Sequence, residues 1–168
     1  HGKNLGSFGT AGCFSLAPNK IITSGQGGIV VTNNSELFKK LKILKNQGRE
    51  GPTTGGEDKY VSVGYNFKFT NLQSSLVISQ LKTINWRIRR LKEIYQFYLN
   101  NLNQNKNFKI IKFNLKDGEV PLWVDVWCLK RNKLFNFLKK KNIICRYYWK
   151  PINTCKSYKS SFKGLLNS

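Results

Sequence analysis

The stretch Gly12–Gly28 constrains this chain more than any other, because it places one lysine, Lys20, between an apolar lead-in and a glycine-rich turn. The turn runs directly into Ile29–Val31, an apolar run that predicts a buried strand. Residues 7–34 contain no other charged side chain, whereas most lysines of the chain lie in dense basic runs. In apolar, weakly solvated surroundings an amine loses part of its preference for the ammonium form and becomes a nucleophile toward carbonyls. Lys20 is therefore a candidate Schiff-base lysine.

Two ordinary interpretations of the same residues stay open at this level. Pro18–Lys20 also fits a surface loop with a solvated lysine, and Gly25–Gly28 also fits a hairpin turn. The longer segment reads SFGTAGCFS, then four residues, then Lys20 and IITSGQGGIVVTN. It resembles the internal-lysine segment of the DegT/DnrJ/EryC/StrS-type sugar aminotransferases, which depend on pyridoxal 5'-phosphate (PLP). A second segment, VGYNFKFTNLQ at residues 63–73, is similar to the same family.

The resemblance implies an α/β fold, part of the aspartate-aminotransferase-like fold type I of PLP-dependent transferases. It implies that residues 1–75 are the C-terminal part of a large PLP-binding domain. Residues 76–103 would form a long connecting helix, and residues 104–168 an incomplete small C-terminal α/β domain. We therefore expect a fragment that lacks the N-terminal half, with its pyridinium-pairing aspartate and ring-stacking residue, and the extreme C-terminus.

The resemblance also implies roles for individual residues. Lys20 would form the Schiff base with PLP and then act as general acid–base, where the family's dehydratase relatives carry histidine. Ser15 would hydrogen-bond the PLP phosphate, and Asn66 would reach the phosphate in the neighbouring subunit, which implies a homodimer with shared active sites. Arg146, among aromatic residues, is a candidate for a donor carboxylate or a nucleotide phosphate. Without the resemblance, Ser15 fits a turn hydroxyl, Asn66 a strand-end cap and Arg146 a surface arginine equally well.

The implied activity is PLP-dependent transfer of an amino group from glutamate to a nucleotide-linked 4-keto-6-deoxyhexose, such as GDP-4-keto-6-deoxymannose, in deoxyaminosugar and polysaccharide biosynthesis. Residues 121–126 and 144–154 resemble the end of the GDP-perosamine synthase branch, although the family often has histidine where Asn153 stands. One alternative is a catalytically inactive fragment that keeps only packing and dimerisation surfaces. Another is a basic nucleic-acid-binding domain.

The net charge of +21, from 29 basic and 8 acidic residues, is the only feature that favours nucleic acid. The excess is mostly lysine spread beside abundant asparagine, without zinc-finger or RNA-binding signatures, so nucleic acid is a poor match. A positive field instead favours anionic ligands such as PLP and nucleotide sugars. The four cysteines form no Cys-x-x-Cys pair and no cluster with histidine, so we expect no metal, no disulfide framework and a reducing cytoplasm. No apolar run is long enough to span a membrane.

Periodicity and capping residues predict the remaining elements. Glu57–Asp58, the only adjacent acidic pair, is interpreted as a solvated loop pair. Thr70 and Gln73 form a predicted capping box. Asn132 is a predicted helix cap. The first part of the chain predicts a helix from 35 to about 48, a surface loop and candidate lid at 49–59, and extended chain at 61–69. One long helix is predicted from 72 to about 101. Beyond it we predict strands at 109–112, 120–128 and 143–149 and a short helix around 134–138.

Overall fold

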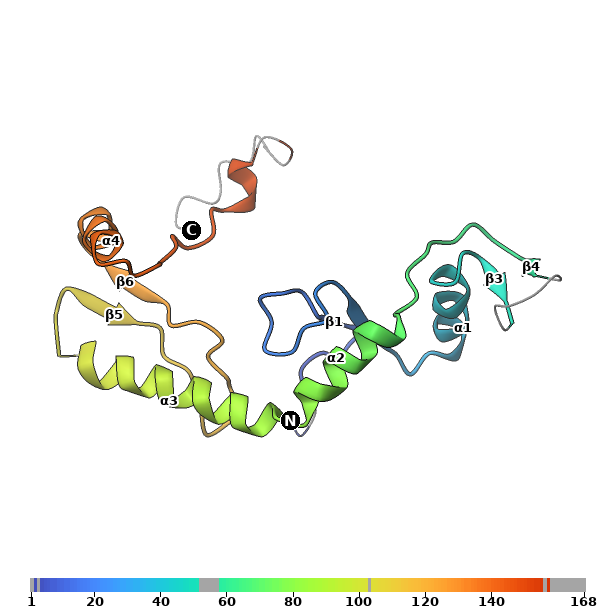
Figure 1. Cartoon of the computed structure of the whole chain (residues 1–168), viewed down its shortest axis with the longest axis horizontal. Helices are drawn as coiled ribbons and strands as arrows, with labels where there is room; N and C mark the ends of the chain where they lie inside the picture. Colours follow the sequence, from blue (N-terminus) through green and yellow to red (C-terminus); the bar gives the residue numbers. More distant parts are fainter. Residues whose placement is uncertain (1, 3, 52–57, 103, 156, 158–168) are drawn as a thin grey trace. The chain divides into compact units, whose positions relative to one another are not determined.

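The computed structural model describes residues 2, 4–51, 58–102, 104–155 and 157. The chain divides into two compact units, His1–Leu91 and Lys92–Ser168. Figure 1 follows the order of the helices and strands along the chain. The boundary between the units falls inside a helix, and each unit is described by itself.

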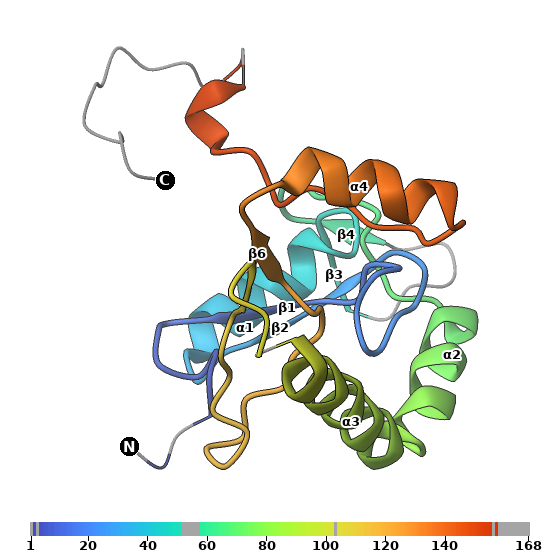
Figure 2. The same ribbon diagram turned by 90° about the vertical axis from the view of Figure 1, so that its left-hand side faces the viewer.

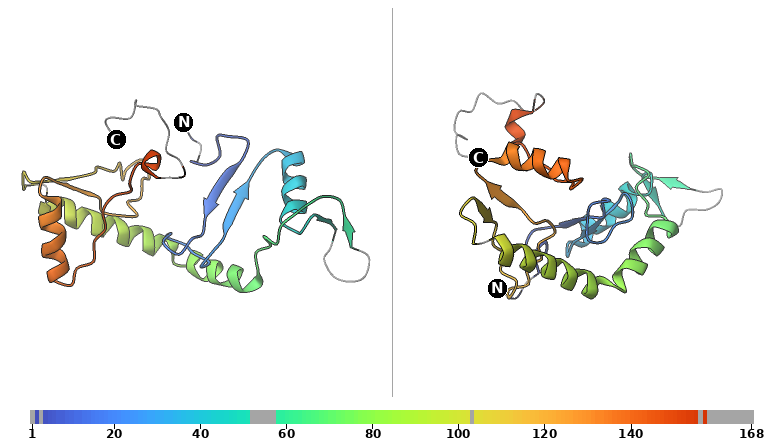
Figure 3. Two further views of the ribbon diagram at one scale, coloured as in Figure 1. Left: turned by 90° about the horizontal axis from the view of Figure 1, so that it is seen from above. Right: turned by 60° about the vertical axis from the view of Figure 1, so that its left-hand side comes forward.

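The first unit begins with a two-stranded antiparallel ribbon. Strand β1 (Gly12–Ser15) pairs with β2 (Gly28–Val31), with Gly12 opposite Val31 and Ser15 opposite Gly28, and Figure 3 shows them side by side. The strand predicted after the glycine turn is thus confirmed. Its predicted burial is wrong, because every residue of β2 is exposed. In the described part of the chain β2 pairs with β1 alone, so a two-stranded ribbon buries little of either face.

Helix α1 (Ser35–Leu44) follows the ribbon and begins at an asparagine cap. The Leu37 amide donates to Asn34 Oδ1 at 2.9 Å, so Asn34 is the N-terminal cap of α1. The helix ends earlier than predicted, and Gln47 and Gly48 then take left-handed backbone angles, with φ of 63° and 78°. Those angles turn the chain away from the helix axis.

Strands β3 (Arg49–Glu50) and β4 (Lys59–Tyr60) form a short antiparallel ribbon at the two ends of the predicted surface loop. Residues 52–57 of that loop, including Glu57 of the acidic pair, lie outside the described residues. The two ends of the loop are therefore held together by the pairing of β3 with β4.

The single long helix predicted from 72 to about 101 is wrong, because two helices occupy this region (Figure 1). Helix α2 (Asn71–Leu81) begins at the predicted capping box, with the Thr70 side chain bound to the Gln73 amide and the Gln73 side chain bound to the Thr70 amide. Helix α3 (Ile84–Leu102) begins after a break at Lys82 and Thr83. There the Thr83 amide and hydroxyl both donate to the Gln80 carbonyl at 3.1 Å, so a side-chain hydroxyl competes with the regular helical bonds.

The second unit contains an antiparallel strand pair, a helix beside it, and the buried Tyr95 of α3. Strand β5 (Phe108–Ile110) pairs with β6 (Val126–Cys128), and Figure 2 shows α4 (Arg131–Lys140) beside β6; a short 3-10 helix follows at Ile152–Thr154. The Tyr95 side chain is 2% exposed and meets Phe113 edge-on, with ring centroids 5.5 Å apart. Its hydroxyl donates to the Ile111 carbonyl at 3.3 Å and accepts from the Phe113 amide at 3.1 Å.

Three predictions for the second unit are corrected. The strand predicted at 120–128 shrinks to β6; the buried Pro121 near its start has no N–H for a ladder bond. Residues 143–149 form no strand in the described chain, because their backbone finds no ladder partner there. Tyr147 instead stacks on Phe135, with centroids 4.6 Å apart. Asn132 is not the cap of α4: it lies inside the helix, where its Oδ1 accepts from the Tyr147 hydroxyl at 3.2 Å.

Candidate active site

Lys20 lies in the loop Ala17–Gly27, called here the lysine loop, which joins β1 to β2. Backbone hydrogen bonds close this loop at its base. The Leu16 amide donates to the Gly27 carbonyl at 2.9 Å, and the Ser24 amide donates to the Leu16 carbonyl at 3.1 Å. The Lys20 amide donates to the Ala17 carbonyl at 3.0 Å, so the lysine sits on a tight turn.

Two hydroxyl side chains brace the lysine loop from within. Thr23 Oγ1 donates to the Leu16 carbonyl at 2.9 Å and accepts from the Gly25 amide at 2.9 Å. Ser24 is 5% exposed, and its hydroxyl donates to the Gln26 carbonyl at 2.8 Å. The polar groups that the loop buries are therefore paired, and its backbone has a defined path.

Position 27 of the same loop requires glycine, because the Phe69 ring and the Ser24 hydroxyl lie close to its backbone. A Cβ at this position would lie 2.6 Å from the Phe69 ring and 2.7 Å from Ser24 Oγ. The residue also has φ of 153°, which side chains rarely adopt. The glycine-rich stretch thus brings residue 69, from the second family-like segment, against the lysine loop.

Ser15 and Lys20 come to the same end of the β1–β2 ribbon. Ser15 is the last residue of β1, and its Oγ accepts from the Ala17 amide at 3.3 Å. Both residues are exposed. The expectation of apolar, weakly solvated surroundings for Lys20 is therefore wrong in the described chain, because its side chain is exposed on the loop that joins β1 to β2.

Asn66 lies on an extended segment that is bound to the end of α1. It forms an isolated antiparallel bridge with Asn46. The Gln47 amide donates to the Tyr65 carbonyl at 2.9 Å, and the Phe67 amide donates to the Lys45 carbonyl at 3.0 Å. The Asn66 side chain is exposed, so backbone pairing sets its position and leaves its amide available.

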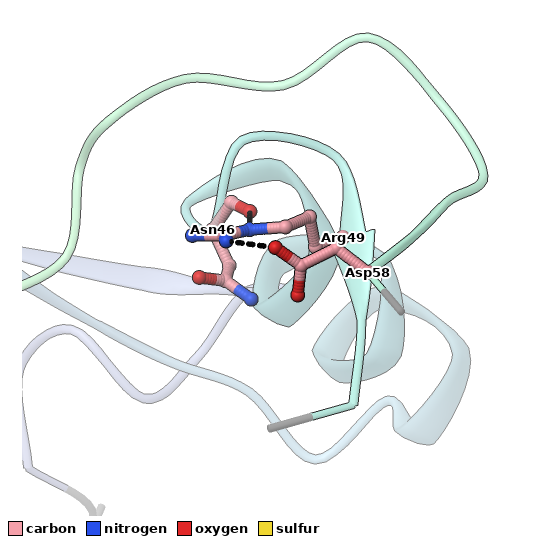
Figure 4. Close-up of polar contacts among 3 residues, drawn as sticks. All are labelled: Asn46, Arg49 and Asp58. Atoms are coloured by element: carbon pink, nitrogen blue, oxygen red, sulfur yellow. Dashed lines mark hydrogen bonds and ion pairs between the residues drawn. The ribbon is translucent and has the colours of Figure 1, made fainter. Parts of the chain in front are cut away.

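Arg49 and Asp58 brace the backbone next to this bridge (Figure 4). Arg49 Nη1 lies 2.6 Å from Asp58 Oδ2, with both side chains largely buried, and Arg49 Nε donates to the Asn46 carbonyl at 3.5 Å. The hydrogen bond to Asp58 raises the pKa of the Arg49 guanidinium above its ordinary value, so it stays charged at physiological pH. The interpretation of Asp58 as a solvated loop residue is thus corrected.

Sequence reasoning missed the Arg49–Asp58 pair. The two residues stand nine positions apart across a glycine-rich segment. Their opposite charges were visible in the sequence, but only the pairing of β3 with β4 brings them together.

Arg146, the remaining predicted site residue, belongs to the unpaired segment 143–149 of the second unit and is exposed there. The three aromatic residues that follow it, Tyr147, Tyr148 and Trp149, are also exposed, although Tyr147 packs on Phe135 of α4. Its role stays a prediction.

The donor set at the end of the ribbon fits PLP, which the family resemblance implies. An exposed primary amine on Lys20 can condense with an aldehyde. Because Ser15 Oγ accepts from the Ala17 amide, its own proton remains for an anionic phosphate oxygen. Across the described residues no three histidine, cysteine or acidic side chains gather as metal ligands, and the four cysteines are free. Within the same residues, no helix combines the length and apolarity that crossing a membrane requires.

The sequence matches the DegT/DnrJ/EryC1/StrS aminotransferase family over residues 1–167. It is 31% identical over 166 residues to UDP-4-amino-4,6-dideoxy-N-acetyl-beta-L-altrosamine transaminase of Campylobacter jejuni, covering 94% of this chain and 43% of that protein. It is 30% identical over 166 residues to GDP-perosamine synthase of Escherichia coli O157:H7, covering 96% of this chain and 44% of that protein.

The fold is similar to Helicobacter pylori PseC, an aminotransferase involved in the biosynthesis of pseudoaminic acid. The TM-score is 0.81 at 28% sequence identity, covering 96% of this chain and 44% of that one. The expected α/β fold of this class of transferase is thus confirmed. The chain spans less than half the length of the relatives that it matches.

Proposed function

The chain belongs to the DegT/DnrJ/EryC1/StrS aminotransferase family, and from that premise we propose that it carries the lysine of a PLP-dependent sugar aminotransferase. The observation that carries the proposal is the family match across residues 1–167, within which Lys20 sits on a closed loop at the end of the β1–β2 ribbon. PLP, when bound, supplies the electron sink for transfer of the amino group.

In this proposal Lys20 and Ser15 divide the work at the end of the ribbon. The Lys20 amine would hold the cofactor and would carry a proton as general acid–base. The Ser15 hydroxyl donates to the phosphate and so fixes the far end of the cofactor. The tight turn at Ala17–Lys20 supports this arrangement, because it begins two residues after Ser15 and keeps the two residues on adjacent parts of the chain.

The proposed substrate is a nucleotide-linked 4-keto-6-deoxyhexose, such as GDP-4-keto-6-deoxymannose, with glutamate as amino donor. The amino group moves to the keto carbon, and glutamate leaves as 2-oxoglutarate. The names of the relatives, which are transaminases or synthases of nucleotide-linked amino sugars, support this class. The excess of positive charge favours such anionic substrates, and Arg146 would bind a carboxylate or phosphate. Deoxyaminosugar and polysaccharide biosynthesis in the cytoplasm is the matching context.

Covalent capture tests the proposal directly. We expect the intact protein to give a lysine-bound cofactor absorbance band with PLP, and borohydride followed by digestion to place the label on the peptide that contains Lys20. Lys20→Ala should remove both signals, whereas Lys39→Ala, an exposed lysine of α1, should keep both. A label on another peptide, or none, would contradict the proposal.

The proposed assembly is a homodimer in which Asn66 serves the neighbouring active site. The exposed Asn66 amide on a backbone bridged to Asn46 supports this role. Mixing inactive Lys20→Ala subunits with inactive Asn66→Ala subunits should then restore activity in mixed dimers, because one of the two sites regains both residues. If Asn66 served the site of its own subunit, mixing would restore nothing.

A further inference from the structure

Three side chains of α2 and α3 bind the backbone of the lysine loop. They are Gln73, Gln80 and Arg87, spaced seven residues apart along the sequence. Gln73 Nε2 donates to the Gln26 carbonyl at 2.8 Å, and Arg87 Nη1 donates to the Ile21 carbonyl at 3.3 Å. Gln80 binds Thr23, which lies between these two points in the loop. The loop is thus attached to the helices at Ile21, Thr23 and Gln26, all of which follow Lys20 in the sequence.

Gln80 makes the strongest of these attachments, because it uses both ends of its amide on one residue. The Thr23 amide donates to Gln80 Oε1 at 3.1 Å, and Gln80 Nε2 donates to the Thr23 carbonyl at 2.7 Å. Both bonds are partly buried, which strengthens them relative to bonds in open water. Gln80 Nε2 also donates to the Leu76 carbonyl of its own helix at 2.8 Å, which fixes the direction of the side chain.

The two flanking side chains are oriented by second bonds of their own. Gln73 Oε1 accepts from the Thr70 amide in the capping box, so its Nε2 is left for the loop. Arg87 Nε donates to Thr83 Oγ1 at 3.2 Å, at the break between α2 and α3. Residues seven apart lie on nearly the same face of a helix, which places Gln73 and Gln80 together on α2. This polar row therefore consists of groups already held in the direction of the loop.

We propose that Gln80 is a positioning residue for Lys20, acting through Thr23 to set the path of the lysine loop. Thr23 in turn binds the Leu16 carbonyl and the Gly25 amide through its hydroxyl, so a fixed Thr23 fixes both sides of the turn that carries Lys20. Gln80 has no part in the chemistry itself. The consequence for catalysis rests on the function proposed for Lys20, whereas the attachment of the loop does not.

Hydrogen exchange and cofactor capture on the intact protein test this together. Gln80→Met keeps the length of the side chain and removes both bonds to Thr23. We expect exchange of the Thr23 amide and its neighbours in residues 16–27 to become about tenfold faster, as for the loss of buried hydrogen bonds. The rate of PLP capture at Lys20, monitored by absorbance, should fall by a similar factor. The midpoint of unfolding should move little.

Two further variants keep the test decisive. Gln80→Glu retains an acceptor for the Thr23 amide but sets a carboxylate oxygen against the Thr23 and Leu76 carbonyls, so it should loosen the loop at least as much as Gln80→Met. It also serves if Gln80→Met does not fold. Gln96→Met, at an exposed glutamine of α3 that binds Asn100, is the matched control and should change neither readout.

Loop exchange that stays at the wild-type rate in both Gln80 variants would overturn the proposal. Faster exchange with unchanged capture would also overturn it, because Gln80 would then hold the loop without positioning Lys20. If the wild-type protein does not capture PLP at Lys20, the proposed function fails, and the exchange rates alone then decide whether Gln80 sets the path of the loop.

Discussion

The lysine loop of the first unit and the Tyr95 cluster of the second are held by different kinds of contact. Side chains 57 and 66 residues away in sequence hold the loop through polar bonds to its backbone. Tyr95 is buried at 2% exposure, and its hydroxyl binds backbone groups 16 and 18 residues away. The loop thus depends on polar partners distant in sequence, whereas Tyr95 combines a buried ring with hydroxyl bonds to backbone groups nearer in sequence.

The two kinds of contact should contribute differently to the free energy of unfolding. Burial of an aromatic side chain contributes several kcal/mol to a fold, whereas one hydrogen bond contributes about 1 kcal/mol. A loop held by polar bonds can be disturbed at modest cost in stability, which suits the role proposed above for the lysine loop. We therefore expect substitutions in the two regions to affect different measurements.

Tyr95→Ala should have the largest effect on stability. Removing a buried aromatic ring costs about 3–5 kcal/mol, because a cavity replaces its packing. Chemical denaturation with hydrogen exchange should locate the loss in residues 92–128. Tyr98→Ala, at an exposed tyrosine of the same helix, should cost far less. The contrast between the regions would be broken if Tyr95→Ala loosened the lysine loop as much as its own unit.

Gly48→Ala should come next, because a Cβ there would lie 1.8 Å from the Ser62 carbonyl oxygen, which is backbone and has to move. The φ of 78° adds backbone strain to the clash. We expect the free energy of unfolding, measured by thermal unfolding, to fall by more than the roughly 1–3 kcal/mol that such strain costs by itself. Gly51→Ala has φ of 90°, and no atom of the described residues lies within 4 Å of the added Cβ, so this variant serves as the comparison for backbone strain. Equal costs for the two variants would remove close backbone approach as a factor near Asn66.

Thr70→Ala should cost about 1 kcal/mol, since it removes one half of the capping box of α2. Because Gln73 serves both this box and the Gln26 carbonyl, exchange should quicken at the first turn of α2 and more weakly at Gln26. Ser75→Ala, whose exposed hydroxyl binds only locally at the Leu72 carbonyl, is the control and should stay near zero. Exchange at Gln26 that does not respond would show that the cap and the loop are independent.

Asp58→Asn should have the smallest effect, below that of Thr70→Ala, because solvent screens a pair that is not fully buried. Since the folded-state pKa of Arg49 is raised, its contribution persists below the ordinary arginine value and is lost only as pH rises through the folded-state value. Unfolding should therefore show little pH dependence from Arg49 near neutrality, and the cost should shrink at high salt. Glu50→Gln, in the exposed pair with Lys59, should cost less still. A strong pH dependence near neutrality that vanished in Asp58→Asn would contradict this account.

Features governed by neighbouring residues could be predicted from the sequence. The Thr70–Gln73 box is confirmed, because a side chain three positions away is enough to pair a free amide at a helix start. The lysine segment is also long enough to indicate the family by its residues alone. The roles of Lys20, Ser15, Asn66 and Arg146 stay predictions.

Features that need a distant partner could not be predicted. Residues 143–149 have strand-like composition, yet a strand forms only where a second backbone lies alongside. The apolar pattern of 72–101 is continuous across the break at Thr83, and the exposure of Ile29–Val31 depends on how many strands pair with β2. Periodicity contains none of this information.

The sequence by itself determined the Thr70–Gln73 capping box and the lysine segment with its family, because each depends on chemistry within a few residues. Only the tertiary structure decided that Gln73, Gln80 and Arg87 meet the lysine loop and that Arg49 meets Asp58. The physical reason is that these bonds join groups far apart in the sequence, which come within hydrogen-bonding distance only when the chain folds.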